Sequence, residues 1–596
     1  MALKCFSLDK TKAFGYYMAL QMNRDRRPKG DKMIYDSKPW LKSYDPDVSH
    51  EIEITDRSLI DRFNRVMQQL RDRDAFHFLD VSMTYEDLME NANCFARCLV
   101  DHNVKKGDVV AINLPNTPQY LIALIGTLKA GCIVSGLSPL LTPKEMAYQL
   151  NDCQAKALVT LDAIFEKKLT EIIPELEYLK LIFPTGLLDF LPKYKQWLAK
   201  WFKKIPTGKV KNLPDKKIIF FKEALYLYPP NLPDIDLQQT DPCFLQYTGG
   251  TTGKPKGALL SHGNAMANMF QFENWAKMAW GKEIICSGFP MFHAAGLTIA
   301  TMSICFGCTQ IIIPDPRDTR RISHECARYH PTFMANVPTL YLLLLQDPEF
   351  KKLDFSNLRV CMSAAAPFPV ENMKHFEKII GQGKLAELYG MTETGPVQTM
   401  NPYKGTKKPG SVGLPLQSTL IRIVDLVDGK TQLPIGEDGE IIVSGPQVMK
   451  GYYNKPEETA KALREHDGRI WMHTGDIGRM DKDGYVYIAD RAKDMIIVGG
   501  YKVFSREVED EIFAHPAIEQ CAIIGTKNPD RPETEIVKLV IQKNLAYKNT
   551  PDHVIQEEIL ALAKEKLSPY KIPKIFEFVD EIPLTHVGKV NKKALR

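Results

Sequence analysis

The sequence predicts an α/β protein with a large N-terminal domain of layered α/β subdomains and a small β-rich subdomain, followed by a small α+β domain. Three observations favour this class. The chain has 596 residues, more than one hydrophobic core usually supports. Strand and helix patterns alternate from Gly107 over about the next three hundred residues. From about Gly410 the pattern changes to short apolar segments separated by turn residues.

Hydrophobic spacing identifies the elements in order. Apolar residues recur at helical spacing over 58–71 and over 83–100, and the stretch 107–139 indicates strand, loop, helix and strand. Short strands are predicted over 410–488. From Lys493 onward, helices and strands alternate as in a compact unit of about a hundred residues. We therefore predict an N-terminal extension over 1–41, a large domain over 42–492 and a small domain over 493–596.

Composition excludes several classes of protein. The hydrophobic fraction of 44% is ordinary, and a net charge of +5 gives no case for nucleic-acid binding. No apolar run reaches the length of a membrane-spanning helix, and Lys4, Asp9 and Lys10 interrupt any signal peptide. The twelve cysteines are scattered, and Cys305 and Cys308 lack a second ligand pair for zinc. We expect buried, reduced thiols and a cytoplasmic protein.

One insert departs from the α/β pattern. Over 187–205, leucines and aromatic residues, Trp197 and Trp201 among them, recur at helical spacing with five lysines largely between them. Such a helix suits peripheral contact with an anionic membrane. An ordinary helix that docks on its own domain and exposes its lysines fits the pattern equally well.

The stretch 245–262 concentrates residues that bind phosphate. Glycines allow close backbone approach to an anion, consecutive N–H groups can surround phosphate oxygens, and Lys254 and Lys256 supply countercharge. A Walker A loop needs a glycine where this chain has Thr248, and Ser or Thr where it has Pro255. The stretch therefore predicts a different triphosphate loop, with a flexible surface hairpin as the alternative.

Three further stretches carry polar or small residues that identify no function by themselves. The segment 361–368 (CMSAAAPF) has three alanines against which a flat ring could lie. The segment 387–395 (ELYGMTETG) offers an aromatic ring, a hydroxyl and a carboxylate. His293 lies in an apolar region, where a histidine usually belongs to the core. The segment 332–345 is also mainly apolar and could line a pocket together with that region.

Together with the loop, these motifs resemble the adenylate-forming superfamily, which includes acyl-CoA synthetases, firefly luciferases and the adenylation domains of peptide synthetases. The loop is similar to the signature [S/T]-[S/T/G]-G-[S/T]-T-G-x-P-K-G. Residues 583–589 are similar to the family's ending, P-x-T-x-[S/T]-G-K, with Val587 in place of the usual hydroxyl. The strings FLQYTGGTTG, PNTPQYLIALIGTLKAG and LTPKEMAYQLND resemble bacterial long-chain fatty-acid–CoA ligases most.

The resemblance implies a site for ATP and Mg²⁺. It assigns Asp476 to the ribose hydroxyls, and Thr248 and Glu393 to the metal. The ATP site as a whole would comprise Thr248, Gly249, Gly250, Thr251, Thr252, Gly253, Lys256, Ala364, Ala365, Tyr389, Thr392, Asp476 and Arg491.

The resemblance also assigns the remaining steps. Lys589, with Thr392 and Glu393, would catalyse adenylation, and the small domain would swing about Lys493 to bring up coenzyme A. Gly499 and Gly500 would line the channel for its pantetheine arm. The acyl pocket would be lined by His293, Ala335, Val337 and Gly390.

The expected activity is ATP-dependent ligation of a medium- to long-chain fatty acid to coenzyme A through an acyl-adenylate. The chain departs from the family where SGLSP (135–139) lacks the usual asparagines and where Ser505 replaces a proline. The alternatives are a fatty acyl-AMP ligase, another carboxylic-acid–CoA ligase, a luciferase-like oxygenase and a non-catalytic nucleotide- or lipid-binding protein.

Overall fold

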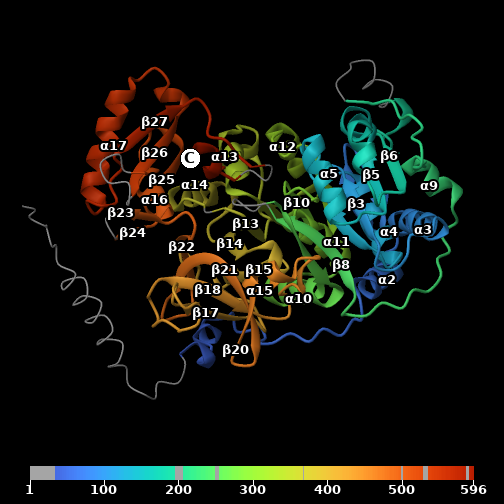
Figure 1. Cartoon of the computed structure of the whole chain (residues 1–596), viewed down its shortest axis with the longest axis horizontal. Helices are drawn as coiled ribbons and strands as arrows, with labels where there is room; N and C mark the ends of the chain where they lie inside the picture. Colours follow the sequence, from blue (N-terminus) through green and yellow to red (C-terminus); the bar gives the residue numbers. More distant parts are fainter. Residues whose placement is uncertain are drawn as a thin grey trace, which may run out of the picture.

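The computed structural model describes residues 34–194, 206–248, 254–366, 368–498, 501–527, 535–585 and 589–596. It confirms the predicted fold class: a large part built from three sheets and their helices, and a small α+β part at the C-terminal end (Figure 1). Among the described residues, no helix combines the length and the apolar character needed to cross a membrane. The eleven cysteines described are buried and free, as expected.

The first sheet of the large part has eight strands in the order β19-β9-β8-β4-β3-β5-β6-β7. The central strands pair in parallel and are buried along their whole length in β3 and β4, as expected for strands covered on both faces. The strands are β3 (Val109–Asn113), β4 (Ile133–Gly136), β5 (Ala157–Leu161), β6 (Leu181–Thr185), β7 (Lys217–Ile218), β8 (Pro242–Thr248), β9 (Lys256–Ser261) and β19 (Gly451–Tyr452). The antiparallel hairpin β8–β9 carries the predicted phosphate loop.

Helices cover this sheet, and the spacing predicted those that lie within 58–71, 83–100 and 107–139. Ser58 caps α2 (Leu59–Leu70) by accepting the N–H of Asp61, 3.3 Å away. The others are α3 (Tyr85–Asp101), α4 (Pro118–Lys129), α5 (Pro143–Asp152), α9 (Phe221–Leu227) and α10 (His262–Trp275). Short helical turns lie at α6 (Asp162–Ile164), η3 (Phe165–Leu169), α7 (Thr170–Ile172) and η4 (Ile173–Glu175).

The second sheet has nine strands in the order β16-β15-β14-β13-β12-β10-β11-β1-β2. Each of its inner parallel strands is joined to the next by a helix, the βαβ unit that the alternation predicts. In chain order the elements are β1 (Asp74–Phe78), β2 (Val81–Thr84), β10 (Ile284–Ser287), α11 (Ala294–Phe306), β11 (Thr309–Ile312), α12 (Thr319–Tyr329), β12 (Phe333–Asn336), α13 (Pro338–Gln346), η5 (Phe350–Lys352), β13 (Val360–Ser363), α14 (Val370–Ile380), β14 (Leu385–Gly390), η6 (Thr392–Thr394), β15 (Val397–Met400) and β16 (Leu414–Pro415).

The β-rich part is an antiparallel sheet in the order β17-β18-β21-β20, with β22 paired to β21. Its elements are β17 (Leu420–Val424), β18 (Gly439–Ser444), α15 (Pro456–Ala462), β20 (Leu463–His466), β21 (Arg469–Met480) and β22 (Val486–Arg491). Two short turns, η1 (Ile34–Ser37) and η2 (Pro39–Ser43), pack against it. Trp40 is buried and Arg422 pairs with Asp36 at 2.8 Å, although the sequence places both Trp40 and Asp36 in the N-terminal extension.

The small C-terminal part has its own hydrophobic core, which includes Ile496, Val508, Ile523 and Ile559. Its elements are β23 (Ile496–Val498), β24 (Tyr501–Val503), α16 (Ser505–Ile512), β25 (Ile518–Lys527), β26 (Glu535–Lys543), η7 (Leu545–Tyr547), α17 (Asp552–Lys566), β27 (Ile575–Val579) and α18 (Lys592–Leu595). In Figure 1 this part, in red, lies beside α13, α14 and β22. A separate core is what a unit that moves as one body needs.

The lysine- and tryptophan-rich segment lies partly outside the described residues, which stop at Tyr194 and resume at Pro206. Leu188 and Leu191 are buried in the core of the large part, so the start of the segment docks on its own domain. Tyr194 is exposed. Trp197 and Trp201 are not described, and the choice between membrane contact and docking stays open for them.

Candidate active site

Three residues predicted to hold the nucleoside come together from three separate stretches of chain. Asp476 lies on β21 with only 3% of its surface exposed, Tyr389 lies at the end of β14, and Arg491 lies at the end of β22. The Tyr389 hydroxyl donates to Asp476 Oδ2 at 2.6 Å, and Arg491 Nε lies 3.0 Å from Asp476 Oδ1. The carboxylate raises the pKa of the Arg491 guanidinium and, after burial, also that of the Tyr389 hydroxyl. The Asp476 carboxylate is therefore held between two donors.

Glu393 lies in the turn η6, directly after β14, and is buried together with Thr392. Its Oε1 accepts the hydroxyl of Tyr452 at 2.7 Å, and its backbone oxygen accepts the N–H of Met449 at 2.9 Å. Burial raises the pKa of the Glu393 carboxyl. Because burial disfavours the charged carboxylate, a cation bound beside it would stabilise its ionised form.

Lys589 reaches this site from the C-terminal end of the chain. The backbone N–H of Lys589 donates to Thr585 Oγ1 at 3.2 Å, and the backbone carbonyl of Lys589 accepts the N–H of Thr585 at 2.7 Å. These two bonds fix the position of Lys589 relative to Thr585. Burial, then the cation of Arg491, lowers the pKa of the Lys589 ammonium to about 8, while the carboxylates of Asp476 and Glu393 oppose the shift. The structure thus brings Lys589 together with the residues that sequence motifs place around ATP.

The ends of the predicted phosphate loop are described, but Gly249, Gly250, Thr251, Thr252 and Gly253 lie outside the described residues. Thr248 ends β8 and Lys256 begins β9. Lys256 Nζ lies 2.5 Å from Glu458 Oε2 and 4.8 Å from the centre of the Tyr452 ring. Lys254 Nζ lies 5.2 Å from the centre of the Tyr148 ring. The loop lysines thus contact tyrosines on both sides of the hairpin.

Parallel strands of the second sheet end at one edge and gather the small residues predicted for the adenine and acyl sites. Val337 follows β12, Ala364 and Ala365 follow β13, and Gly390 ends β14. The three strands pair in register, with Asn336 opposite Ser363 and Ser363 opposite Glu387. A Cβ at Gly390 would lie 1.7 Å from the carbonyl oxygen of Pro396, so only glycine fits there. Ligands of open α/β sheets bind at this kind of edge.

The other two residues predicted for the acyl pocket differ in their surroundings. Ala335 is fully buried within β12. His293 is the N-terminal cap of α11, where its Nδ1 accepts the N–H of Ala295 at 3.4 Å. Burial and the cation of Lys589 lower the pKa of His293 to about 4, so its imidazole is neutral at pH 7. A neutral ring beside Lys589 fits the mouth of an apolar pocket.

Sequence reasoning missed a small, mainly apolar cavity between β8, α10 and α11. It is lined by residues including Phe244, Met269, Leu297, Thr301 and Pro396. Ala294, which follows His293, also lines it, and Pro396 lies three residues after Glu393. The small and apolar composition of 287–306 was the signal for such a space. The cavity therefore lies close in the chain to two residues of the candidate site.

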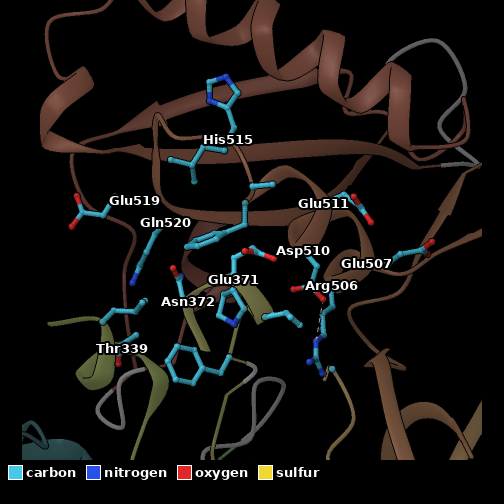
Figure 2. A pocket seen from close by; sticks show the side chains of 18 of the residues that line it. Thr339, Glu371, Asn372, Arg506, Glu507, Asp510, Glu511, His515, Glu519 and Gln520 are labelled. Carbon is cyan, nitrogen blue, oxygen red and sulfur yellow. Dashed lines mark ion pairs between the residues drawn. The ribbon is translucent and has the colours of Figure 1, made fainter. Parts of the chain in front are cut away.

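Sequence reasoning also missed an open cleft between the large and small parts (Figure 2). Thr339 on α13, and Glu371 and Asn372 on α14, face Arg506 and Asp510 on α16. Arg506 Nε lies 3.7 Å from Asp510 Oδ2. No local pattern could predict the cleft, because its walls come from segments more than a hundred residues apart.

The proposed hinge and channel residues lie next to one another in the chain. Lys493 follows β22 and is exposed. Although the residue as a whole is exposed, partial desolvation of its ammonium and then the nearby cation of Arg491 lower the pKa of Lys493. Gly499 and Gly500 lie outside the described residues.

Comparisons with known proteins show the family of the chain. Residues 63–453 match the family model described as "AMP-binding enzyme", and residues 507–589 match "AMP-binding enzyme C-terminal domain". The chain is 39% identical to a long-chain-fatty-acid–CoA ligase of Bacillus subtilis (strain 168), over 94% of this chain and 97% of the relative. It is 37% identical to a long-chain-fatty-acid–CoA ligase of Escherichia coli O157:H7, over 94% and 98%. The crystal structure of ATP-bound MatB from Rhodopseudomonas palustris matches with a TM-score of 0.78 and 28% identity, over 90% of this chain and 98% of MatB.

Proposed function

The chain belongs to the AMP-binding enzyme family, and we propose that it joins a fatty acid to coenzyme A in two ATP-dependent steps. The observation that carries the proposal is the convergence of Lys589, from the small part, with Asp476, Glu393 and Arg491 of the large part. The long-chain-fatty-acid–CoA ligases to which the chain is similar over most of its length support the same activity and substrate class.

The first step makes the carboxylate reactive. A carboxylate oxygen of the fatty acid attacks the α-phosphorus of ATP, a new P–O bond forms, and the bond to pyrophosphate breaks. Two anions must approach each other, so charge neutralisation is the main demand on the site. Lys589 and Arg491 supply positive charge there, and the partly buried position of Lys589 strengthens its effect.

The second step transfers the acyl group. The sulfur of coenzyme A attacks the acyl carbon of acyl-AMP, the C–O bond to AMP breaks, and the thiol proton is released. This step needs access for a long thiol rather than a new side-chain nucleophile. We propose that the small domain, 493–596, rotates about Lys493, and that Gly499 and Gly500 leave room for the pantetheine arm. The separate core of the small part and the open cleft support this proposal.

We assign the nucleotide contacts as follows. Asp476 binds the ribose hydroxyls, and Tyr389, Ala364 and Ala365 hold the adenine ring. Thr392 and the hairpin residues Thr248, Gly249, Gly250, Thr251, Thr252, Gly253 and Lys256 bind the phosphates. The contacts of the Asp476 carboxylate with Tyr389 and Arg491 support this assignment, because a buried and fixed carboxylate is a strong acceptor for two hydroxyls.

Mg²⁺ fits the donors present. Glu393 is a buried carboxylate, and burial raises its pKa because it disfavours the charged form. A bound cation would stabilise that charged form. Glu393 and Thr248 would hold the ion, and Mg²⁺ would supply charge neutralisation on the triphosphate.

We propose that the acyl chain is medium to long and lies along His293, Ala335, Val337 and Gly390 toward the cavity beside α11. Each buried methylene contributes roughly 0.8 kcal/mol to binding in such surroundings. The apolar lining and the neutral imidazole of His293 support an alkyl chain over a charged substrate.

Peripheral membrane contact through 187–205 is a further part of the proposal. Tyr226 on α9 is 89% exposed and Leu227 is exposed beside it, and Lys222 of the same helix donates to the carbonyl of Asp189 at 3.2 Å. The exposed Tyr226 and Leu227 therefore lie on the helix that contacts the described start of this segment. Each basic residue near an anionic surface contributes on the order of 1 kcal/mol.

Co-sedimentation with anionic liposomes at low salt tests the membrane contact. Wild-type protein should pellet, and a variant with Trp197→Ser, Trp201→Ser, Lys200→Glu, Lys203→Glu and Lys204→Glu should not, while its turnover of soluble acids is unchanged. Wild-type protein that stays in the supernatant would show that the segment is an ordinary docked helix.

An assay with ATP, coenzyme A and acids of graded length tests the activity. We expect equal amounts of AMP, pyrophosphate and acyl-CoA, with highest kcat/KM for medium- to long-chain acids. Pyrophosphate and acyl-AMP without thioester would indicate an acyl-AMP ligase, and light emission would indicate an oxygenase. Absence of any product would refute the proposed function.

A further inference from the structure

The carboxylate of Asp152 joins three parts of the large domain. Asp152 is the last residue of α5, and its side chain is 12% exposed. Its Oδ1 lies 2.6 Å from Lys455 Nζ, and its Oδ2 accepts the hydroxyl of Tyr247 at 2.7 Å. The hydroxyl of Tyr148, one turn earlier on α5, lies 3.3 Å from Oδ1. Only Tyr247 lies in the stretch 245–262, and none of these residues is assigned a contact with ATP.

These contacts hold both described ends of the phosphate hairpin. Tyr247 directly precedes Thr248 on β8, where the loop begins. The hydroxyl of Tyr148 donates to the carbonyl of Pro255 at 2.9 Å, immediately before β9. The end of α5 therefore ties the outgoing and the returning strand of the hairpin to one place.

The third partner extends the link to the β-rich subdomain. Lys455 is the residue before α15, and the same short helix carries Glu458, which pairs with Lys256 at 2.5 Å. The neighbouring β19 pairs with β9, with Tyr452 opposite Ala258. Lys455, the cap of α15, thus contacts Asp152, and Glu458 on the helix itself contacts the hairpin.

The charges fit a network that needs an ionised Asp152. Burial, with the adjacent carboxylate, raises the pKa of the Tyr148 hydroxyl to about 12 and raises that of Tyr247 as well. Both phenols therefore remain neutral donors at working pH, and Lys455 supplies the countercharge. An amide in place of the carboxylate has one acceptor oxygen, so it cannot serve Tyr247 and Lys455 from two oxygens.

We propose that Asp152 is a positioning residue for ATP, which sets the spacing and orientation of the two strands that carry the phosphate loop. The inference rests on the proposed function, since it takes 245–262 as the triphosphate-binding hairpin. Preorganised donors bind an anion without paying the ordering cost at the moment of binding. Loss of Asp152 should therefore weaken ATP binding and leave the acyl and coenzyme A sites unchanged.

Kinetics of Asp152→Asn test this role. We expect KM for ATP to rise roughly tenfold, as the loss of one charge-assisted contact implies, with KM for the fatty acid and for coenzyme A within about twofold. Lys455→Met should raise KM for ATP similarly, and the double variant should be no worse than either single variant, because both changes break one contact. Asp101→Asn is the matched control: Asp101 ends α3 and pairs with Arg97 at 2.8 Å, and its change should alter nothing.

Equilibrium binding of labelled ATP, measured on the same variants, separates the two proposals. Weakened ATP binding in Asp152→Asn, with a thermal unfolding midpoint close to wild type, supports the positioning role even if no acyl-CoA is formed. Unchanged ATP binding in an active enzyme would overturn the role of Asp152 and leave the ligase proposal standing. An equal rise in all three KM values would also overturn it, because that result indicates general structural damage.

Discussion

The boundary between the large and small parts has two sides that hold their charged groups differently. On the side that we call the lysine side, Lys589 lies among Asp476, Glu393 and Arg491, and each carboxylate also accepts a tyrosine hydroxyl. On the side that we call the cleft side, α16 faces α13 and α14 across open space, and Asp510 is 3.7 Å from Arg506 (Figure 2).

The difference indicates which side of the boundary takes part in chemistry and which side allows the small part to move. The hydrogen bonds on the lysine side lie within the large part and fix its two carboxylates, while the open cleft leaves the small part free to move away from them. A broad, well-packed interface on both sides would make rotation expensive. We therefore infer that the described arrangement is the one that serves adenylation.

The largest effect is expected at Asp476. Asp476→Asn weakens the proposed ribose contact and the pairing with Arg491, and two charge-assisted contacts are together equivalent to roughly 10²–10³ in kcat/KM for ATP. Asp510→Asn makes the same change on the cleft side and should cost less than about twofold, as exposed ion pairs do. Steady-state kinetics of both variants check the contrast. Equal losses would mean that the two sides do not differ in function.

The next effect concerns Glu393. Changing a residue that only supports a metal ligand lowers metal affinity by roughly 10–100-fold. Glu393→Gln, which changes a proposed ligand itself, should therefore raise the Mg²⁺ concentration for half-maximal activity by at least about tenfold. Glu371→Gln, on the cleft side, is the matched control. Titration of activity with Mg²⁺ decides the point, and identical curves for Glu393→Gln and wild type would refute the assignment.

A pH effect distinguishes the lysine side without any mutation. Because the pKa of Lys589 is lowered to about 8, the ammonium is the main form below pH 8 and is lost as pH rises. We expect kcat/KM for adenylation to fall roughly tenfold between pH 7 and 9. Lys589→Arg should move this fall to higher pH, because arginine stays protonated. A flat profile in the wild type would show that the charge of Lys589 is not required.

The smallest effect is expected at the proposed hinge. Lys493→Pro fixes its own φ and restricts Ala492, so rotation of the small part should slow. We expect the two half-reactions to differ by at least about threefold in their response. Lys493→Ala removes the charge without restricting the backbone and serves as the control. Wild-type rates for both half-reactions in Lys493→Pro would place the hinge elsewhere.

Local patterns predicted most of the fold. The helix over 59–70 begins at a serine cap with an aspartate three residues later, and the buried, mainly apolar strands of the first sheet have the composition of parallel, doubly covered strands. The start of the large part was less predictable, because the buried Trp40 packs against Gly484, more than four hundred positions away in the chain. Such burial leaves no local signal.

The candidate site also contains residues that local sequence could predict and residues that it could not. Motif resemblance identified Glu393, Asp476 and Lys589, but it could not supply their partners. Tyr452 holds Glu393 across 59 residues, and Lys455 holds Asp152 across 303 residues. Each of these partners has an ordinary local context, a tyrosine after a glycine and a lysine before a proline. Only the folded chain shows which distant polar groups meet.

Separate measurement of the two half-reactions in Lys589→Ala tests the central claim most directly, with Lys593→Ala, an exposed lysine of the same tail, as control. If Lys589 acts in adenylation, pyrophosphate release from ATP and the fatty acid should fall roughly 10²–10³-fold, while synthetic acyl-AMP and coenzyme A should still react at the wild-type rate. Lys593→Ala should retain both rates. Equal loss of both half-reactions in Lys589→Ala, or full retention of adenylation, would contradict the account.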